Sequence, residues 1–284
     1  MNVKRIWCIL SIICIVLSAC TADKETLDES GANKKVWQVL AFDGVVEDGL
    51  EHTANPGFLE PEHILRDDPR FPKERTFELE GKTYQTVLEM GLLYVVGEES
   101  HLYSRRGMLL YTQGDMMIAA LPDTWDIVGF HNKAFGKEEL EDKELTEEAV
   151  INIARNYMAE KIDDIDAYQA KISRIERGFN LEFYRYINGQ KTEDTVGMLV
   201  GSDGKVYQYI IRKYRVFEQF KDEINQERTD EAIKRIEAAL GENCTLNPDS
   251  AIIITGEDAI YLQASYVKDV GNNIGYTLRL FTEY

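Results

Sequence analysis

The sequence has few of the residues from which most enzyme sites are built. Its 284 residues include only four histidines, six prolines and four cysteines. A nucleophile elbow, a phosphate-binding glycine loop, a dinucleotide-binding glycine pattern, an HExxH zinc motif and a CxxC pair are all missing. We therefore expect a protein without catalytic residues or a cofactor, unless a site is assembled from residues that lie far apart in the sequence.

Long apolar runs are also scarce, since only the N-terminus carries one. A basic start at Lys4 and Arg5 is followed by an apolar run over residues 6–17. The run spans about a dozen residues, whereas a hydrocarbon core needs roughly twenty, so it is too short for a permanent transmembrane helix. The order of basic, apolar and small residues is typical of an export signal that is removed.

The signal ends in Leu17-Ser18-Ala19-Cys20, which resembles the lipobox of bacterial lipoproteins. The resemblance implies that residues 1–19 are cleaved off and that Cys20 carries a diacylglyceryl group. Two acyl chains anchor a protein stably, whereas one chain binds only marginally. We expect the protein on the outer face of the cytoplasmic membrane, or in the outer membrane if the organism has one. The alternatives are an ordinary secretory signal with an incidental cysteine and an uncleaved anchor.

The remaining cysteines give no internal disulfide. Cys8 and Cys14 leave with the signal and Cys20 is acylated, so Cys244 is the one thiol left. Because Cys244 has no basic residue or histidine beside it, we expect a passive thiol rather than a nucleophile.

Acidic residues outnumber basic ones by 50 to 32, which gives a formal net charge of -18. A chain of this charge repels a phosphate backbone, so we expect no nucleic-acid partner. The acids are spread along the chain, as in a solvated surface. Asp163, Asp164 and Asp166 lack the glycine and the distant glutamate of a calcium loop, so we interpret them as a turn after a helix.

Composition divides the first half of the chain into a tether and a strand-rich domain. Residues 20–35 are small, polar and charged, which is typical of a flexible tether. Residues 36–137 hold short apolar runs between turn residues, which predicts strands. The predicted strands are residues 36–42, 75–79, 83–87, 92–96, 109–112, 116–121 and 127–130. Glu80-Gly81 is a tight-turn signal, so residues 75–79 should pair with residues 83–87 as a hairpin. Residues 55–72 hold four of the six prolines and should form an irregular surface loop, whose function stays open.

A helix followed by strands is predicted for residues 138–222. Thr146 can cap the helix, and Glu147 and Glu148 suit the positive end of its dipole. After the helix the pattern alternates, with turns at Asn188-Gly189 and Asp203-Gly204. A helix packed across an antiparallel sheet is the simplest way to bury these apolar faces.

A second, shorter unit of the same kind is predicted for residues 223–284. Residues 229–233 repeat the order of threonine, two acids, alanine and an aliphatic residue found at residues 146–150. Predicted strands follow at residues 251–255, 259–267 and 276–282. The predicted fold class is α+β, with a strand-rich N-terminal domain followed by one or two helix-plus-antiparallel-sheet units. The alternative is a chance match between two amphipathic helices.

Residues 145–214 resemble the PepSY and PepSY-like modules of bacterial envelope proteins, including YcdB/YcdC-type proteins. The matching residues are 145–150, Tyr184-Arg185-Tyr186 before the Asn-Gly turn, 196–200 and 202–206. The resemblance implies a small binding module outside the cytoplasm, of a class linked to peptidase inhibition or regulation. The second unit departs from the pattern because its strands have no Asp-Gly turn. The layout alone also resembles two-component regulators of the YycH/YycI type.

Four tyrosines form the candidate binding face. Tyr184, Tyr186, Tyr207 and Tyr209 recur at every second position, which would place them on one face of a sheet. Cross-strand stacking explains this spacing without a ligand. If the face is exposed, it becomes a candidate surface for binding a peptide.

Two histidines are the weak candidates for a metal site. Glu51-His52 and Glu62-His63 flank the proline-rich stretch, and carboxylate and imidazole are zinc ligands. No third ligand is evident, so we expect solvated histidines and no bound metal.

These observations together predict a non-catalytic, membrane-anchored binding or regulatory lipoprotein that modulates an envelope peptidase or sensor. Its partners would be the membrane, through the lipid on Cys20, and an envelope protein or peptide. One alternative is an envelope hydrolase with a site assembled from dispersed Glu, Asp and His residues. Another is a structural spacer in the cell wall.

Overall fold

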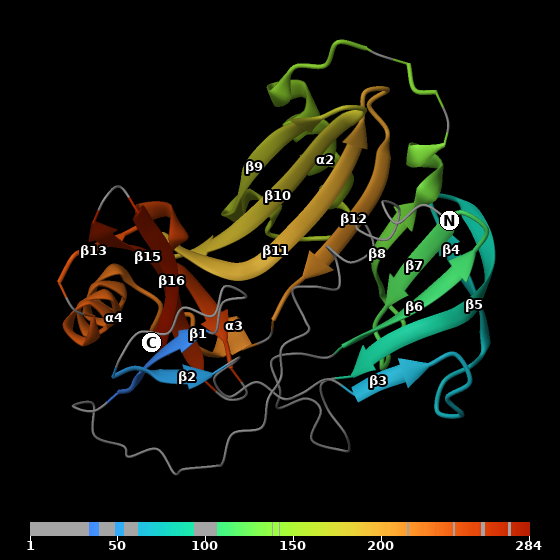
Figure 1. The fold of residues 1–284 in the computed structure, drawn as a ribbon. Helices are drawn as coiled ribbons and strands as arrows, with labels where there is room; N and C mark the ends of the chain where they lie inside the picture. The colour runs from blue at the N-terminus through green and yellow to red at the C-terminus, as the bar shows by residue number, and fades with distance from the viewer. Residues whose placement is uncertain are drawn as a thin grey trace.

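The computed structural model describes residues 34–39, 49–53, 62–93, 107–137, 139–141, 143–214, 216–240, 242–256, 259–271 and 274–284. The predicted signal, the lipobox and Cys20 lie outside the described residues, as does His101. Strands dominate and helices are few, which confirms a strand-rich mixed fold (Figure 1). Within the described part of the chain, no helix has both the length and the apolar character needed to cross a membrane.

The N-terminal part is an antiparallel meander. Its strands are β3 (Glu62–Leu65), β4 (Glu74–Leu79), β5 (Lys82–Leu93), β6 (Met108–Gln113), β7 (Met116–Ala120) and β8 (Ile127–Asn132). The β4–β5 hairpin is confirmed, because Arg75 pairs with Thr86 and both turn residues, Glu80 and Gly81, have positive φ. β3 pairs with β5, so residues 55–72 are not irregular throughout as predicted. The core side chains include Ile64, Phe77, Leu88, Leu109, Tyr111 and Ile118.

The first two strands belong to the other end of the molecule. β1 (Val36–Val39) pairs antiparallel with β16 (Ile274–Glu283), and β2 (Glu51–Thr53) pairs parallel with β1. The sequence pattern placed residues 36–42 in the N-terminal domain, whereas the structure places β1 in the C-terminal sheet. A local pattern cannot reveal this pairing, because periodicity specifies a strand but not its neighbour.

The first helix-plus-sheet unit follows β8 and η3 (Lys133–Gly136). Its elements are α2 (Glu147–Ala159), η4 (Ile165–Ala167), β9 (Tyr168–Ile175), β10 (Gly178–Ile187), β11 (Gln190–Gly201) and β12 (Val206–Arg212). Thr146 caps α2 as predicted, since its hydroxyl accepts from the N–H of Ala149 at 3.2 Å. Asn188 and Gly189 form the predicted turn, and both have positive φ.

The second unit has the same layout but a different helix start. Its elements are α3 (Val216–Gln219), α4 (Gln226–Ala239), β13 (Cys244–Leu246), η5 (Pro248–Ser250), β14 (Ile252–Thr255), β15 (Ile260–Gly271) and β16. The predicted helix start at Thr229 is wrong, because Asn225 caps α4 by accepting from the N–H of Arg228 at 3.0 Å. Thr229 lies inside α4, where it is buried and donates to Gln190 Oε1 at 2.8 Å.

β11 joins the two units into one continuous sheet. It pairs antiparallel with β10 and β12, and near its start it pairs parallel with β14 through Thr192 and Ile253. Glu193 strengthens this junction, because its Oε1 accepts from the N–H of Thr255 at 2.6 Å. Beyond β14 the strand order is β15, β16, β1 and β2.

Candidate binding surface of the first unit

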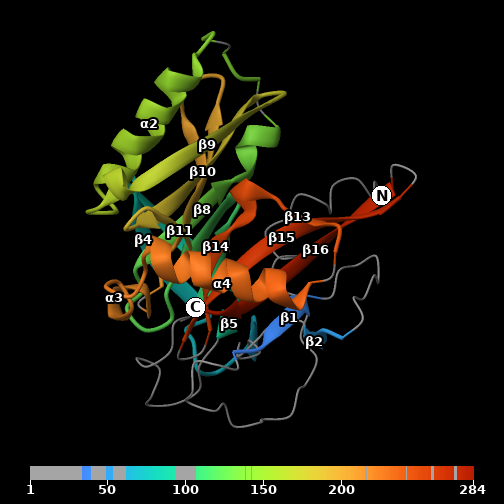
Figure 2. The ribbon, with the colours of Figure 1, turned by 90° about the vertical axis from the view of Figure 1, so that its left-hand side faces the viewer.

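The sheet formed by β9 to β12 has one covered and one uncovered face. Leu181 and Phe183 of β10 are almost fully buried, as are Val150 and Ala154 of α2, and all four belong to one core cluster. Figures 1 and 2 together show α2 on one side of the sheet, with no described helix crossing the opposite side of β10 and β11. Because side chains alternate along a strand, the even-numbered residues of β10 lie on the uncovered face.

The four tyrosines do not share one exposed face. Tyr184 and Tyr186 are half-buried on the uncovered face of β10. Tyr209 is only 2 % exposed, because it pairs with Met198 and therefore points to the helix side, where its ring lies 5.2 Å from that of Phe130.

Tyr207 is buried as well, with 5 % of its surface exposed. Its hydroxyl donates to Asp203 at 3.0 Å, and its ring lies 5.2 Å from that of Phe135. The register of β11 and β12 shifts between Leu199 and Val200, so the period of two is interrupted here. The candidate binding face is thus reduced from four tyrosines to Tyr184 and Tyr186.

These two tyrosines lie among charged side chains, and we call the group the tyrosine face. Its members are Lys171, Glu182, Tyr184, Tyr186, Lys191 and Arg212. The strand register brings them together, because Lys171 pairs with Glu182, Tyr186 pairs with Lys191, and Tyr184 and Arg212 both pair with Thr195. The sequence pattern identified the tyrosines. The cations lie on β9, β11 and β12, so their proximity to the tyrosines follows only from the strand register.

Contacts within the tyrosine face hold Tyr184 in place. The ammonium of Lys191 lies 3.9 Å from the centre of the Tyr184 ring, and the Tyr184 hydroxyl donates to Glu182 at 3.0 Å. Burial and the nearby Glu182 carboxylate raise the pKa of Tyr184 to about 12. Burial and the repulsion from Lys171 lower the pKa of Lys191. The tyrosine face therefore carries an excess of positive charge on a chain of strongly negative net charge.

A buried ion cluster fixes the junction behind this face. The Arg185 guanidinium lies 2.8 Å from Asp164, 3.2 Å from Asp194 and 2.7 Å from Glu218. Asp194 also accepts from the N–H of Tyr214 at 2.7 Å. Burial raises the pKa of Asp194 to about 7, although the Tyr214 N–H and Arg185 oppose the rise.

The ion cluster ties together the α2–β9 connection, the β10–β11 hairpin and α3. The register of β10 and β11 shifts between Tyr184 and Tyr186, so Arg185 sits at an irregularity. Such a bulge redirects a side chain locally. The sequence held one signal for this cluster, because Arg185 interrupts the inward-facing apolar residues of β10.

The two candidate metal residues lie on strands that do not pair with each other. His63 is exposed on β3, and the neighbouring Glu62 is engaged by Arg70 at 2.6 and 2.9 Å. His52 lies on β2, which pairs with β1 and not with β3. No group of three or more metal-ligating side chains occurs among the described residues.

Comparison with known proteins gives one weak structural similarity. No protein-family model matches the sequence, and no curated protein matches it either. The chain is similar to the Bacillus megaterium YpeB C-terminal domain, with a TM-score of 0.34 and 11% sequence identity over 73% of this chain and 82% of that chain.

Proposed function

We propose that the protein is a non-catalytic lipoprotein of the bacterial envelope that binds a polypeptide partner through its tyrosine face. The observation that carries the proposal is an uncovered sheet face on which half-buried tyrosines and several cations stand together on an acidic chain. The regulated partner would be an envelope peptidase or sensor, as the PepSY-like pattern of residues 145–214 implies.

The chemistry of the tyrosine face suits a protein partner. A tyrosine offers a large, rigid ring with a polar tip, and such residues are enriched where proteins bind each other. Tyr184 is already positioned by Glu182 and Lys191, so binding would cost little side-chain entropy. The surrounding cations would attract an acidic partner and speed its association.

Photo-crosslinking in cells tests the binding surface. The full chain would carry benzoylphenylalanine at Tyr184 or Tyr186, with Lys234 on the exposed side of α4 as the control position. We expect an adduct of defined mass from the tyrosine positions only. Equal labelling at all three positions, or no adduct from any of them, would contradict a binding role for the tyrosine face.

The lipid anchor has its own test. Replacing Cys20 with alanine removes the thiol that the lipobox resemblance assigns to acylation. We expect the wild-type chain in the membrane fraction and the Cys20→Ala chain outside it. Mass spectrometry that finds no fatty acid on the mature N-terminus of the wild type would overturn the anchor.

A further inference from the structure

β9 is a long free edge of the sheet. Its eight residues, Tyr168–Ile175, pair with β10 in an unbroken register, and no other described strand pairs with them. Natural edges are blunted by charged side chains, by proline, by bulges or by a covering segment, and of these β9 has only the charged side chains Lys171 and Arg174. β9 contains no proline and no bulge, and Figure 2, which looks onto this side of the sheet, shows α2 beside the edge rather than across it.

The main-chain groups that face outward from β9 can be identified from one contact. The Tyr168 carbonyl accepts from Arg155 Nη2 at 2.8 Å, so it points away from β10. Main-chain groups alternate in direction along an antiparallel strand. Ala170, Ile172 and Arg174 therefore direct their N–H and C=O groups to the open side, where no described residue pairs with them.

The side chains around this edge are suited to an extended ligand. Ile172 and Ala170 are partly buried at the edge of the α2 core, together with Ile151 of the helix. They offer apolar contacts to every second side chain of an added strand. Lys171 and Arg174 are exposed, and β9 holds no acidic residue. Because side chains alternate along β9, Lys171 lies on the tyrosine face, whereas Arg174 lies on the same side as Ala170 and Ile172. An added strand with apolar side chains beside Ala170 and Ile172 and acidic side chains beside Lys171 and Arg174 would match this arrangement.

We infer that β9 binds an extended, acidic segment of a partner protein as an additional strand of the sheet, beside the tyrosine face. This inference rests on the proposed function and specifies how the partner binds. Main-chain hydrogen bonds would supply affinity, and the apolar and cationic side chains would supply selectivity. A second copy of this chain is a poorer occupant, because two β9 strands would place their cations together and the two chains repel each other through their net charge.

The probe is a fluorescein-labelled octapeptide of valine and glutamate, with valine at the positions beside Ala170 and Ile172 and glutamate at the positions beside Lys171 and Arg174. Two matched peptides replace every glutamate with lysine, or methylate the amide nitrogens along one edge. We expect the full chain to bind the acidic peptide and to bind each matched peptide at least about tenfold more weakly, because one loses charge complementarity and the other loses main-chain donors. Equal affinity for the acidic and N-methylated peptides, or no binding at millimolar concentration, would overturn the inference.

Three variants of the full chain locate the binding site. Ala170→Pro removes an outward N–H while leaving the hydrogen bonds to β10, and the double variant Lys171→Glu, Arg174→Glu reverses the charge. The double variant Lys73→Glu, Lys82→Glu changes the net charge equally at exposed positions outside β9, before β4 and at the start of β5. We expect about a tenfold loss of affinity in the first two and none in the third. If Ala170→Pro unfolds the chain, two other measurements test strand addition. The charge-reversed variant should bind the peptide more weakly, and peptide binding to the wild type should slow amide hydrogen exchange at Ala170, Ile172 and Arg174. Unchanged exchange there would reject strand addition.

Failure of this inference can be told apart from failure of the proposed function. A partner that crosslinks at Tyr184 but still binds the charge-reversed β9 variant would preserve the binding role and reject strand addition. An absence of any adduct at the tyrosine face would reject the binding role itself.

Discussion

The two helix-plus-sheet units differ most at the edges of their sheets. In the first unit β9 has one strand neighbour, whereas in the second unit β16 is covered by β1, which comes from the other end of the chain. β1 adds to β16 in the way that we infer for a partner segment at β9. Among the described strands, the second unit thus holds a completed strand addition at β16, whereas the first unit ends in the open edge of β9.

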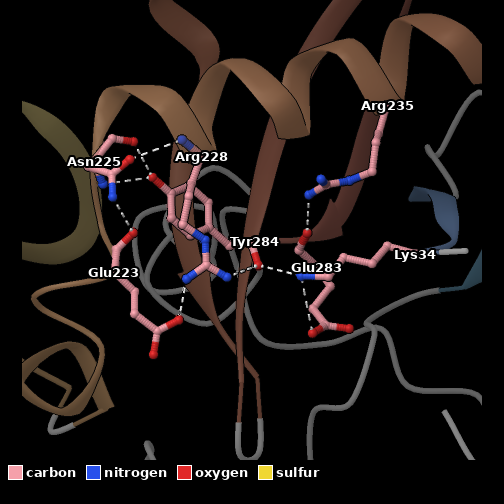
Figure 3. A network of polar contacts seen from close by, with 7 residues as sticks. All are labelled: Lys34, Glu223, Asn225, Arg228, Arg235, Glu283 and Tyr284. Carbon is pink, nitrogen blue, oxygen red and sulfur yellow. Dashed lines mark hydrogen bonds and ion pairs between the residues drawn. The ribbon is translucent and has the colours of Figure 1, made fainter. Parts of the chain in front are cut away.

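The completed edge shows which contacts accompany strand addition. Lys34, just before β1, donates to the main-chain oxygen of Tyr284 at 2.8 Å and lies 3.5 Å from Glu283 (Figure 3). Arg235 of α4 donates to the Glu283 carbonyl at 2.7 Å, and Arg228 donates to the main-chain oxygen of Tyr284 at 3.2 Å. Cations thus fix the last residues of the strand from two sides. At β9, Arg155 likewise donates to the carbonyl of Tyr168, the first residue of the strand, at 2.8 Å.

The largest expected effect comes from breaking the junction between the two units. Replacing Arg185 with alanine would leave Asp194 buried without its main counter-charge, which should cost about 3–5 kcal/mol of unfolding free energy. Urea denaturation with a fluorescence readout measures this loss. Arg174→Ala on exposed β9 is the control and should change stability by less than about 0.5 kcal/mol. Similar values for both variants would show that the buried cluster does not hold the junction.

The next largest effect is expected at the Tyr284 hydroxyl, which lies at the end of β16, beside the completed edge. Tyr284 is 3 % exposed, and its hydroxyl donates to the Asn225 carbonyl at 2.6 Å and accepts from the Asn225 N–H at 3.0 Å. The Thr229 hydroxyl lies 2.8 Å away. Tyr284→Phe removes both hydrogen bonds to Asn225 and leaves the Asn225 N–H without its acceptor, so we expect a loss of about 2 kcal/mol in unfolding free energy.

Tyr184→Phe is the corresponding substitution in the first unit, whose edge strand β9 is open. Its hydroxyl bonds to the exposed Glu182, so we expect almost no change in unfolding free energy. A larger loss from Tyr184→Phe than from Tyr284→Phe would reverse the comparison between the two units.

The pH dependence of stability sharpens the description of the junction. Asp194 has a pKa of about 7 in the folded chain, above the value of about 3.9 for an unperturbed aspartate. Between these values the folded chain holds a proton that the unfolded chain has lost, so the contribution of Asp194 to stability falls as pH rises. Asp194→Asn removes this contribution. We expect the variant to gain roughly 2–3 kcal/mol relative to the wild type between pH 5 and pH 8.

The measurement is urea denaturation of both chains at several pH values. Other carboxylates contribute equally to both chains and cancel in the difference. A difference between the two chains that stays constant from pH 5 to pH 8 would show that Asp194 is already ionised in the folded state.

Local sequence patterns correctly predicted turns and a helix cap, but they did not predict contacts between segments that are far apart in the sequence. The Glu80-Gly81 and Asn188-Gly189 turns and the Thr146 cap depend on neighbouring residues, and the structure confirms them. The pairing of β1 with β16 and the cluster around Arg185 depend on segments far apart in the sequence. For the candidate site, the period of two identified Tyr184 and Tyr186 but also included two tyrosines whose strand register turns them to the core. The free edge of β9 follows from strand order, which no local pattern specifies.

The smallest expected effect separates the two helix starts. Thr146 is exposed and caps α2 through a single hydrogen bond to the Ala149 N–H, so Thr146→Ala should cost about 1 kcal/mol of unfolding free energy. Thr146→Ser keeps an accepting hydroxyl and is the conservative control.

Thr229 has the same place in the sequence repeat but caps nothing, because Asn225 has that role in α4. Thr229→Ser should therefore retain the buried hydrogen bond to Gln190 and leave the helix start unchanged. Asn225→Ala should destabilise the start of α4, which is the effect that the sequence repeat predicted for Thr229. Amide hydrogen exchange in the first turn of each helix measures the loss of the cap. If exchange in α4 is faster in Thr229→Ser than in Asn225→Ala, Thr229 and not Asn225 is the residue that caps α4.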